Sequence, residues 1–304
     1  MPADAASPRL GWDLARDVGE VLEYHFMVNA LLAGGVVAVM AAVVGWLMIV
    51  RRETFAGHTL ALMAFPGASG AALVGVPAAL GYAASCGAGV AAISASSPAL
   101  RSRSEQSAAT GAVQTLALAA GFLFVSLYGG VLGDLESLLF GNVLGVSDDE
   151  LLVLCLVAGG VLAALAALAR PLLFASVDTE VAAARGVPVR ALSLAFLGLL
   201  AVTVAATSQI TGVLLVFALL VAPAAAAQAL TTRPAVSLAL SVALALLIAW
   251  LGLAISYFSI YPAGFFISTL AFGSYLLARA VAPLRAARAS RRRARAPERA
   301  PAPF

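Results

Sequence analysis

The sequence predicts an all-α polytopic membrane protein with about nine transmembrane helices. Only 11% of its 304 residues are charged, 62% are hydrophobic, and the mean hydropathy is +1.01. A soluble chain of this length would need more polar surface than these residues can supply. Asp, Glu, Lys and Arg are absent from six stretches, which are 26–50, 54–100, 106–133, 151–169, 191–232 and 234–278.

The length of each stretch predicts how many helices it holds. A bilayer core is crossed by roughly 20 helical residues, so the three shorter stretches each fit one helix and the three longer ones each fit two. Turn residues divide the long stretches at Gly75–Pro77, Thr207–Gln209 and Tyr261–Gly264. The expected helices are 28–50, 54–74, 77–98, 107–129, 150–169, 191–207, 211–231, 236–257 and 263–282. Eight or ten helices remain open, because residues 131–145 form a candidate for an extra or re-entrant segment.

The positions of Arg predict the orientation of the chain. There is no Lys, so all 18 basic residues are Arg. Positive residues of membrane proteins concentrate in cytoplasmic loops, and here they share that side if the amino terminus is outside and the carboxyl terminus is cytoplasmic. The Arg residues that fall at alternate junctions, at or near the ends of the predicted helices, are Arg51, Arg52, Arg101, Arg103, Arg170, Arg185, Arg190, Arg233 and Arg279. The loop between the fourth and fifth helices holds only acidic charges, from Asp134 to Glu150.

This orientation divides the chain into three regions in a bacterial plasma membrane. Residues 1–25 form an extracytoplasmic segment, and residues 26–283 form the transmembrane domain. Residues 284–304 are rich in Arg, Ala and Pro, which predicts a disordered cytoplasmic tail attracted to anionic lipid rather than to nucleic acid.

The absence of Lys limits the chemistry that the chain can perform. A nucleotide-binding P-loop needs a Lys on the phosphates, and a Schiff base also needs one. An intramembrane enzyme would need a cluster of catalytic polar groups within the membrane, whereas only His58 is available there. The chain is therefore expected to be a transport subunit without its own ATPase site, and any ATP must be used by another polypeptide.

The cytoplasmic segment 170–188 predicts a short capped helix. Asp178 fits the N-cap, Glu180 complements the positive helix end, Gly186 fits the C-cap, and Pro188 prevents continuation. Because so short a helix is not stable alone, it must pack on its own bundle or on a partner. Docking on a soluble motor subunit is one hypothesis, and an ordinary structured loop is the alternative.

His58 is the one ionisable residue deep inside a charge-free stretch, since His25 lies at a membrane edge. Ionisable groups inside a membrane often mark transport paths, and imidazole is a common metal ligand. However, His58 follows Glu53 by only five residues, which places it roughly 8 Å from the cytoplasmic edge. A headgroup contact is therefore the alternative to a role in the pathway.

Six short motifs, in this order along residues 24 to 283, resemble those of the membrane permeases of zinc and manganese ABC importers. They are Tyr24–Gly34, Arg51–Gly67, Leu139–Ser147, Phe174–Pro188, Gly212–Ala224 and Tyr261–Gly264. The resemblance implies structural roles for Gly57, Pro66, Gly67, Gly212, Pro223, Pro262 and Gly264. It also implies an ATPase-docking loop at 174–190 that includes Phe174, Asp178, Glu180, Arg185 and Gly186.

The resemblance further implies an assembly and a substrate. The permease would pair with itself or a paralogue, bind two ATPase subunits, and receive substrate from an extracytoplasmic binding protein. No cofactor would be stably bound, and Zn or Mn would be cargo. The family typically has the pattern Gly-Asp-x-x-Ser-His in this segment. In this chain His58 stands at the Asp position, Ala61 at the Ser position and Leu62 at the His position. A chelated metal, a siderophore or another non-cation substrate is therefore the alternative, as is a secondary transporter, although the spans lack the midplane carboxylates typical of that class.

Overall fold

The computed structural model describes residues 19–20, 23–96, 103–128, 141, 143–259 and 261–294. This part of the chain is helical and contains no strand, which confirms the predicted fold class. Its elements are α2 (His25–Val50), α3 (Thr54–Val74), α4 (Ala78–Ser96), α5 (Arg103–Tyr128), η2 (Val143–Gly145), α7 (Asp148–Val177), α8 (Thr179–Ala184), α9 (Val189–Leu230), α10 (Pro234–Tyr257) and α11 (Ala263–Ala294).

Eight helical segments within the described residues are long and apolar enough to cross a membrane. One of them is the first part of α9, residues 189–212, and the remainder of α9 contributes the shorter apolar segment Leu215–Leu230. The chain is therefore a multi-pass membrane protein. The predicted helix 211–231 corresponds to this shorter segment, which is only about 24 Å long at 1.5 Å per residue.

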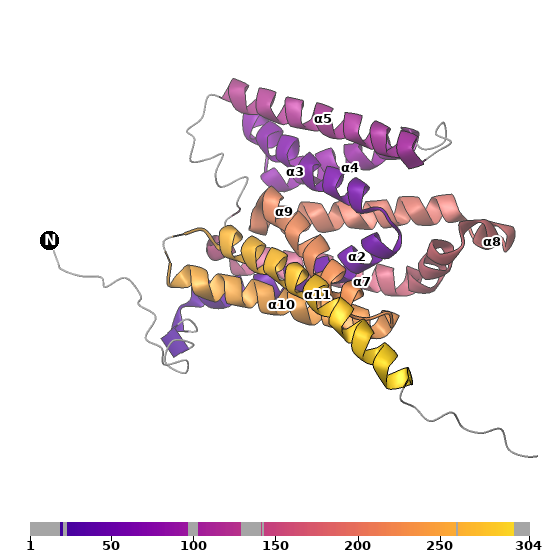
Figure 1. The fold of residues 1–304 in the computed structure, drawn as a ribbon. Coiled ribbons are helices and arrows are strands. Elements are labelled where there is room, and N and C mark those ends of the chain that lie inside the picture. The colour runs from indigo at the N-terminus through magenta and orange to yellow at the C-terminus, as the bar shows by residue number, and fades with distance from the viewer. Residues whose placement is uncertain are drawn as a thin grey trace, which may run out of the picture.

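The predicted turn at Thr207–Gln209 is wrong, because these residues are helical and α9 breaks later, at Gly212. The polar side chains stay within the helix: the Thr207 hydroxyl donates to the Thr203 carbonyl at 2.7 Å, and the Gln209 amide donates to the Ala205 carbonyl at 3.2 Å. Gly212 has φ 76° and ψ 161°, a conformation open essentially only to glycine. After this break the chain turns back, so the two halves of α9 form a hairpin (Figure 1).

Two other helices extend beyond their predicted ends. α7 continues through Arg170 and Pro171 to Val177, because the proline removes only one hydrogen bond from a long helix. α11 continues through Pro283 to Ala294. Residues 284–294 are thus helical where the sequence predicted disorder, since Ala and Arg are strong helix formers. Residues 295–304 and most of 1–25 lie outside the described residues, as do 131–140 and 142 of the candidate re-entrant segment.

Helix α9 is the centre of the packing. It contacts α2, α3, α4, α7, α10 and α11, while α3, α4 and α5 form a layer on one side of it (Figure 1). Small residues permit close approach: a side chain at Gly45 of α2 would collide with the Leu220 carbonyl of α9, and one at Gly67 of α3 would collide with the Gly81 backbone of α4. These contacts hold α2 against the second half of α9, and they hold α3 against α4.

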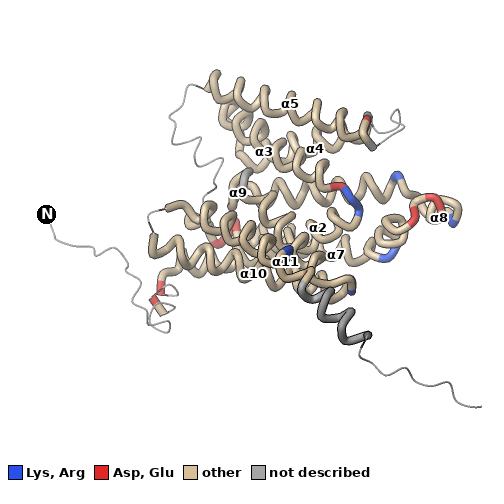
Figure 2. Tube along the Cα trace, viewed as in Figure 1, with Lys and Arg blue, Asp and Glu red and all other residues tan. Residues whose placement is uncertain are grey.

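The two ends of the bundle differ in charge, as the Arg distribution predicts. Positive positions gather at the end that carries α8, where some acidic positions lie as well, whereas the described charges at the opposite end, where α7 begins, are all acidic (Figure 2). Both halves of the α9 hairpin end at the Arg-rich end, near Arg190 and Arg233 (Figures 1 and 2). The structure thus places the candidate docking loop 174–190 at one end of the apolar helical bundle and the acidic residues at the start of α7 at the other end.

Candidate functional site

The loop 174–190, which we call the docking loop, contains the short helix that the sequence predicts. Helix α8 has six residues, and its N-cap is Asp178, whose Oδ1 accepts hydrogen bonds from the backbone N–H of Glu180 at 3.1 Å and of Val181 at 3.0 Å. Gly186 follows the C-cap with φ +80°, which glycine adopts without strain. Pro188 precedes the first residue of α9. These local contacts fix the shape of the loop from within.

The docking loop exposes apolar side chains at the charged end of the molecule. Val177 is 87% exposed, and Phe174 and Val181 are 40% and 44% exposed. Asp178, Glu180 and Arg185 surround them and are exposed as well. α7 is roughly 45 Å long at 1.5 Å per residue, so its last turn extends beyond a bilayer core of about 30 Å. An apolar patch outside the lipid and rimmed by charges is typical of a protein interaction surface.

His58 lies in the second turn of α3, between that helix and the second half of α9. Its ring packs against the Phe217 ring with a centroid distance of 4.5 Å. Its Nδ1 is buried and has no hydrogen-bond partner among the described residues. An unpaired buried ring nitrogen is costly and is thus a group that a ligand could satisfy.

The next turn of α3 offers a second polar atom. Pro66 lies inside the helix and has no N–H, so the carbonyl of Leu62 lacks its usual helical donor. Leu62 follows His58 by four residues and therefore shares its face of the helix. Ala61 is buried and supplies no polar side chain. This stretch of α3 thus offers one imidazole and one carbonyl without its usual helical donor, where the family pattern has a carboxylate and an imidazole.

The remaining motif residues occupy structural positions. Gly57 lies against the Met48 sulfur, and Gly67 against the Gly81 backbone. Gly212 is the break in α9 and Pro223 lies in the second half of that helix. Pro262 directly precedes α11, and Gly264 is in its first turn.

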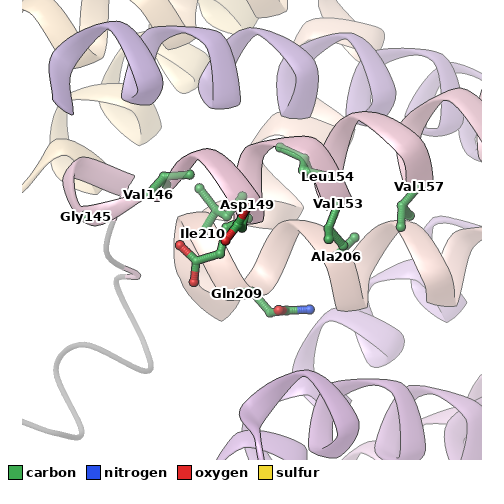
Figure 3. A pocket seen from close by; sticks show the side chains of 10 residues that line it. Gly145, Val146, Asp149, Val153, Leu154, Val157, Ala206, Gln209 and Ile210 are labelled. Atoms are coloured by element: carbon green, nitrogen blue, oxygen red, sulfur yellow. The ribbon is translucent and has the colours of Figure 1, made fainter. Parts of the chain in front are cut away.

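The sequence did not single out a cavity at the acidic end of the bundle (Figure 3). It has a volume of about 350 Å³ and lies between the start of α7 and the end of the first half of α9. Asp149, Glu150 and Gln209 are its polar lining residues. Glu150 closes a capping box with Ser147, which anchors the acidic turn. Acidic residues in a short turn could be seen in the sequence, but only the fold brings Gln209 to them.

Gly141, from the predicted motif Leu139–Ser147, also lies at this end of the bundle. Gly141, with φ +74°, lies directly against the backbone of Thr211 and Gly212. Nearby, the Asp148 carboxylate accepts a hydrogen bond from the Asn29 amide at 2.6 Å and contacts His25 Nε2 at 3.1 Å. These contacts join the start of α2 to the start of α7.

A second cavity lies at the charged end, beside the docking loop. It has a volume of about 480 Å³, and helices α3, α5, α7 and α9 contribute to its walls. Arg51, in the turn before α3, donates from Nη2 to Glu53 at 2.7 Å and to Ser193 at 2.8 Å. Burial raises the pKa of Glu53 above its ordinary value, although the Arg51 guanidinium acts to lower it.

Within the described residues, no three His, Cys, Asp or Glu side chains lie close enough together to hold a metal ion.

The sequence of the chain is similar to those of known membrane permeases. The ABC 3 transport family matches residues 23–282. The manganese transport system membrane protein MntC of Halalkalibacterium halodurans is 31% identical over 241 residues, which cover 79% of this chain and 81% of that protein. The chelated iron transport system membrane protein YfeC of Yersinia pestis is 28% identical over 278 residues, which cover 91% and 94%.

A solved structure has the same fold. PsaBC from Streptococcus pneumoniae, in complex with Fab, aligns with a TM-score of 0.76 and 26% identity over 87% of this chain and 95% of that chain. The family match over residues 23–282 includes all eight helical segments that are long and apolar enough to cross a membrane, apart from the last residue of the eighth. The chain belongs to the ABC 3 transport family.

Proposed function

We propose that this chain is the membrane-spanning permease of an ATP-driven importer for divalent metal ions, with manganese or zinc as the substrate. The observation that carries the proposal is the family match over residues 23–282, together with 31% identity to a manganese permease. In this function the chain does no covalent chemistry. Separate ATPase subunits supply the energy, and the permease alternates between outward-open and inward-open states.

The charge distribution supports an orientation with the Arg-rich end in the cytoplasm. The docking loop then faces the soluble ATPase subunits. Its exposed Phe174, Val177 and Val181 supply apolar contact area, and Glu180 and Arg185 supply charge-specific contacts. Binding of ATP by the partner subunits would move the loop, and the loop continues directly into α9.

The pathway is proposed to run along the face of α3 that carries His58. Neutral imidazole binds d-block cations well, and the Leu62 carbonyl adds an oxygen donor one turn away. In a dimer of this chain, or in a pair with a paralogue, two such faces would supply two imidazoles. Water can complete the coordination shell, because transport needs only transient binding.

The acidic end of the bundle is then extracytoplasmic. Asp149 and Glu150 border the cavity of about 350 Å³ there, and negative charge concentrates cations near such an opening. A binding protein that releases its metal at this end would deliver it next to these carboxylates.

A chelated metal is the second candidate substrate. One relative is a chelated iron permease, and it matches 91% of this chain. The face of α3 has no carboxylate, and a chelated ion needs fewer protein ligands because the chelator keeps its own. His58 would then make a polar contact with the chelate rather than coordinate the metal.

The proposal is tested by purifying the chain with the ATPase subunit that accompanies it and reconstituting the complex in liposomes. We expect ATP-dependent transport of Mn²⁺ or Zn²⁺, and none when the ATPase carries a disabled catalytic site. Transport of chelated iron without transport of free cations would favour the second candidate. A complex that moves none of these substrates, or a chain that binds no ATPase, would refute the importer function.

A further inference from the structure

The Arg51 side chain is the most deeply buried charge that the structure describes at the cytoplasmic end. Only 6% of it is exposed. Its guanidinium lies over the Phe196 ring, with Cζ 5.0 Å from the ring centroid, and it bonds to Glu53 and Ser193. Burying an ion pair costs desolvation energy that the pair seldom recovers fully. The Arg51–Glu53 pair is therefore expected to add little to the stability of the fold. Its more informative effect is to fix the relative positions of the segments that it joins.

The contacts of Arg51 join two segments that are far apart in the sequence. Glu53 is the N-cap residue of α3, whereas Ser193 and Phe196 lie in the first two turns of α9. Ser193 follows Pro188 of the docking loop by five residues, which is roughly 8 Å along a helix. Arg51 thus connects the exit of the docking loop to the start of the helix that carries His58.

The turn that holds Arg51 is itself tightly constrained. Arg52, its central residue, has φ 59°, and its backbone N–H donates to the Ile49 carbonyl at 3.0 Å. The Glu53 N–H donates to the Met48 carbonyl at 3.0 Å. A force applied to Arg51 is therefore passed to α3 rather than absorbed by a flexible loop.

The neighbouring cavity leaves room for movement. Its walls include Ser176 and Thr179 from the docking-loop side and Arg52 and Ala56 from the α3 side. The two sides are separated by about 480 Å³ of open volume, while Arg51 reaches across its edge to Ser193. Displacement of the loop can then change the cavity while the Arg51 contacts carry the motion to α3.

We propose that Arg51 is a positioning residue that couples movement of the docking loop to helix α3, through Ser193 and Phe196 of α9. The inference rests on the proposed function, because it assumes that ATPase subunits move the docking loop. It adds a named connection between the ATP-driven step and the pathway. The Arg51–Glu53 pair would keep α3 in register with α9 as the transporter changes state.

The experiment uses the full chain with its ATPase and reports the state of α3 without relying on any substrate. A background protein carries Leu62→Cys as the probe and Cys155→Ser, which removes the exposed native thiol. The rate at which a methanethiosulfonate reagent modifies the introduced thiol is measured without nucleotide and with ATP plus vanadate. Arg51→Gln with Glu53→Gln removes both charges, so no unpaired buried charge is left. Arg52→Gln is the matched control, because it removes a positive charge from the same turn at an exposed position.

In the background protein and the Arg52→Gln control, we expect nucleotide to change the modification rate by about fivefold or more. In the double variant this change should be lost, with ATP hydrolysis and ATPase co-purification retained. Ser193→Ala removes one hydrogen bond to Arg51 and should reduce the nucleotide-dependent change in modification rate by about half on a logarithmic scale. This variant tests the Arg51 contact with α9 even if the double variant is unstable. A full nucleotide response in both the double variant and Ser193→Ala would overturn the proposal. A background protein whose introduced thiol reacts at the same rate with and without nucleotide would instead refute the importer function on which it rests.

Discussion

The docking loop and the proposed pathway face of α3 differ in exposure and in the kinds of polar and apolar groups that they carry. The loop is exposed, carries apolar and charged side chains together, and is shaped by its own caps. The face of α3 that carries His58 packs against another helix, and its polar groups are one imidazole and one carbonyl without its usual helical donor. Under the proposed function, the loop would hold the partner by many contacts, and the α3 face would hold the substrate by few. A transporter needs both, since the motor must stay bound while the cargo must leave.

The largest expected effect is on the docking loop. Val177→Asp with Val181→Asp places two charges in the apolar patch, and burying them against a partner would cost more than about 2 kcal/mol, or roughly 30-fold in affinity. Co-purification with the ATPase subunit should fall to background. Both side chains are exposed, so the melting temperature of the permease alone should stay unchanged.

Val236→Asp is the control for that prediction. It adds a charge to an exposed position near the start of α10, at the same end of the bundle. ATPase binding should be retained in this variant. Equal loss of binding in both proteins would show that added negative charge, rather than the apolar patch, is responsible.

The second effect is on the pathway. His58→Ala removes the imidazole of the α3 face, and uptake of Mn²⁺ or Zn²⁺ at low concentration should fall about tenfold. ATPase binding should not change, because His58 is not part of the docking loop. The measurement is initial uptake against cation concentration, with His25→Ala as the comparison because it removes the only other histidine. Wild-type uptake of both cations in the His58 variant would exclude a ligand role.

The third effect concerns α9, which joins the two regions. Gly212→Ala forces a side chain into a backbone conformation that costs about 1–3 kcal/mol, at a position whose backbone already lies against Gly141. The melting temperature in detergent should fall. Gly198→Ala, in the same helix with no neighbouring atoms within 4 Å of the added carbon, should be neutral or stabilising. A stable Gly212→Ala protein would contradict the break observed in α9.

The smallest effect is the pH dependence that Glu53 contributes. Its pKa is raised in the folded state because burial disfavours the carboxylate. A group with a raised pKa contributes stability that is present below its unfolded pKa and is lost as pH rises through the folded value. Thermal melts from about pH 4 to about pH 7 should therefore show wild type losing stability relative to Glu53→Gln as pH rises. A difference between the two proteins that is constant with pH would show that the pKa is not raised.

Several elements could be predicted from the sequence because local chemistry determines them. Helix 54–74 was predicted with both ends correct, since Glu53 precedes it and Gly75 ends it with φ +75°. The α8 helix and its Asp178 cap were predicted for the same reason. Charge-free runs and Arg positions determined the class, because the bilayer imposes both.

Other features depend on contacts between distant residues. The break in α9 lies at Gly212 rather than at the polar residues just before it, because those side chains bond back to their own helix. The Arg51 contacts require Ser193 and Phe196, which lie in a helix far along the chain. No local pattern reveals such a pairing. The roles of His58 and the docking loop stay predictions that the variants above can test.

The most direct test of the central claim is ATP-dependent manganese uptake by cells that lack their own manganese importers and produce this chain with its ATPase and binding protein. The account predicts uptake that saturates, disappears when the ATPase is catalytically disabled, and disappears equally in the Val177→Asp, Val181→Asp permease. Manganese uptake that persists in either protein would contradict it, because transport would then not depend on a docked motor.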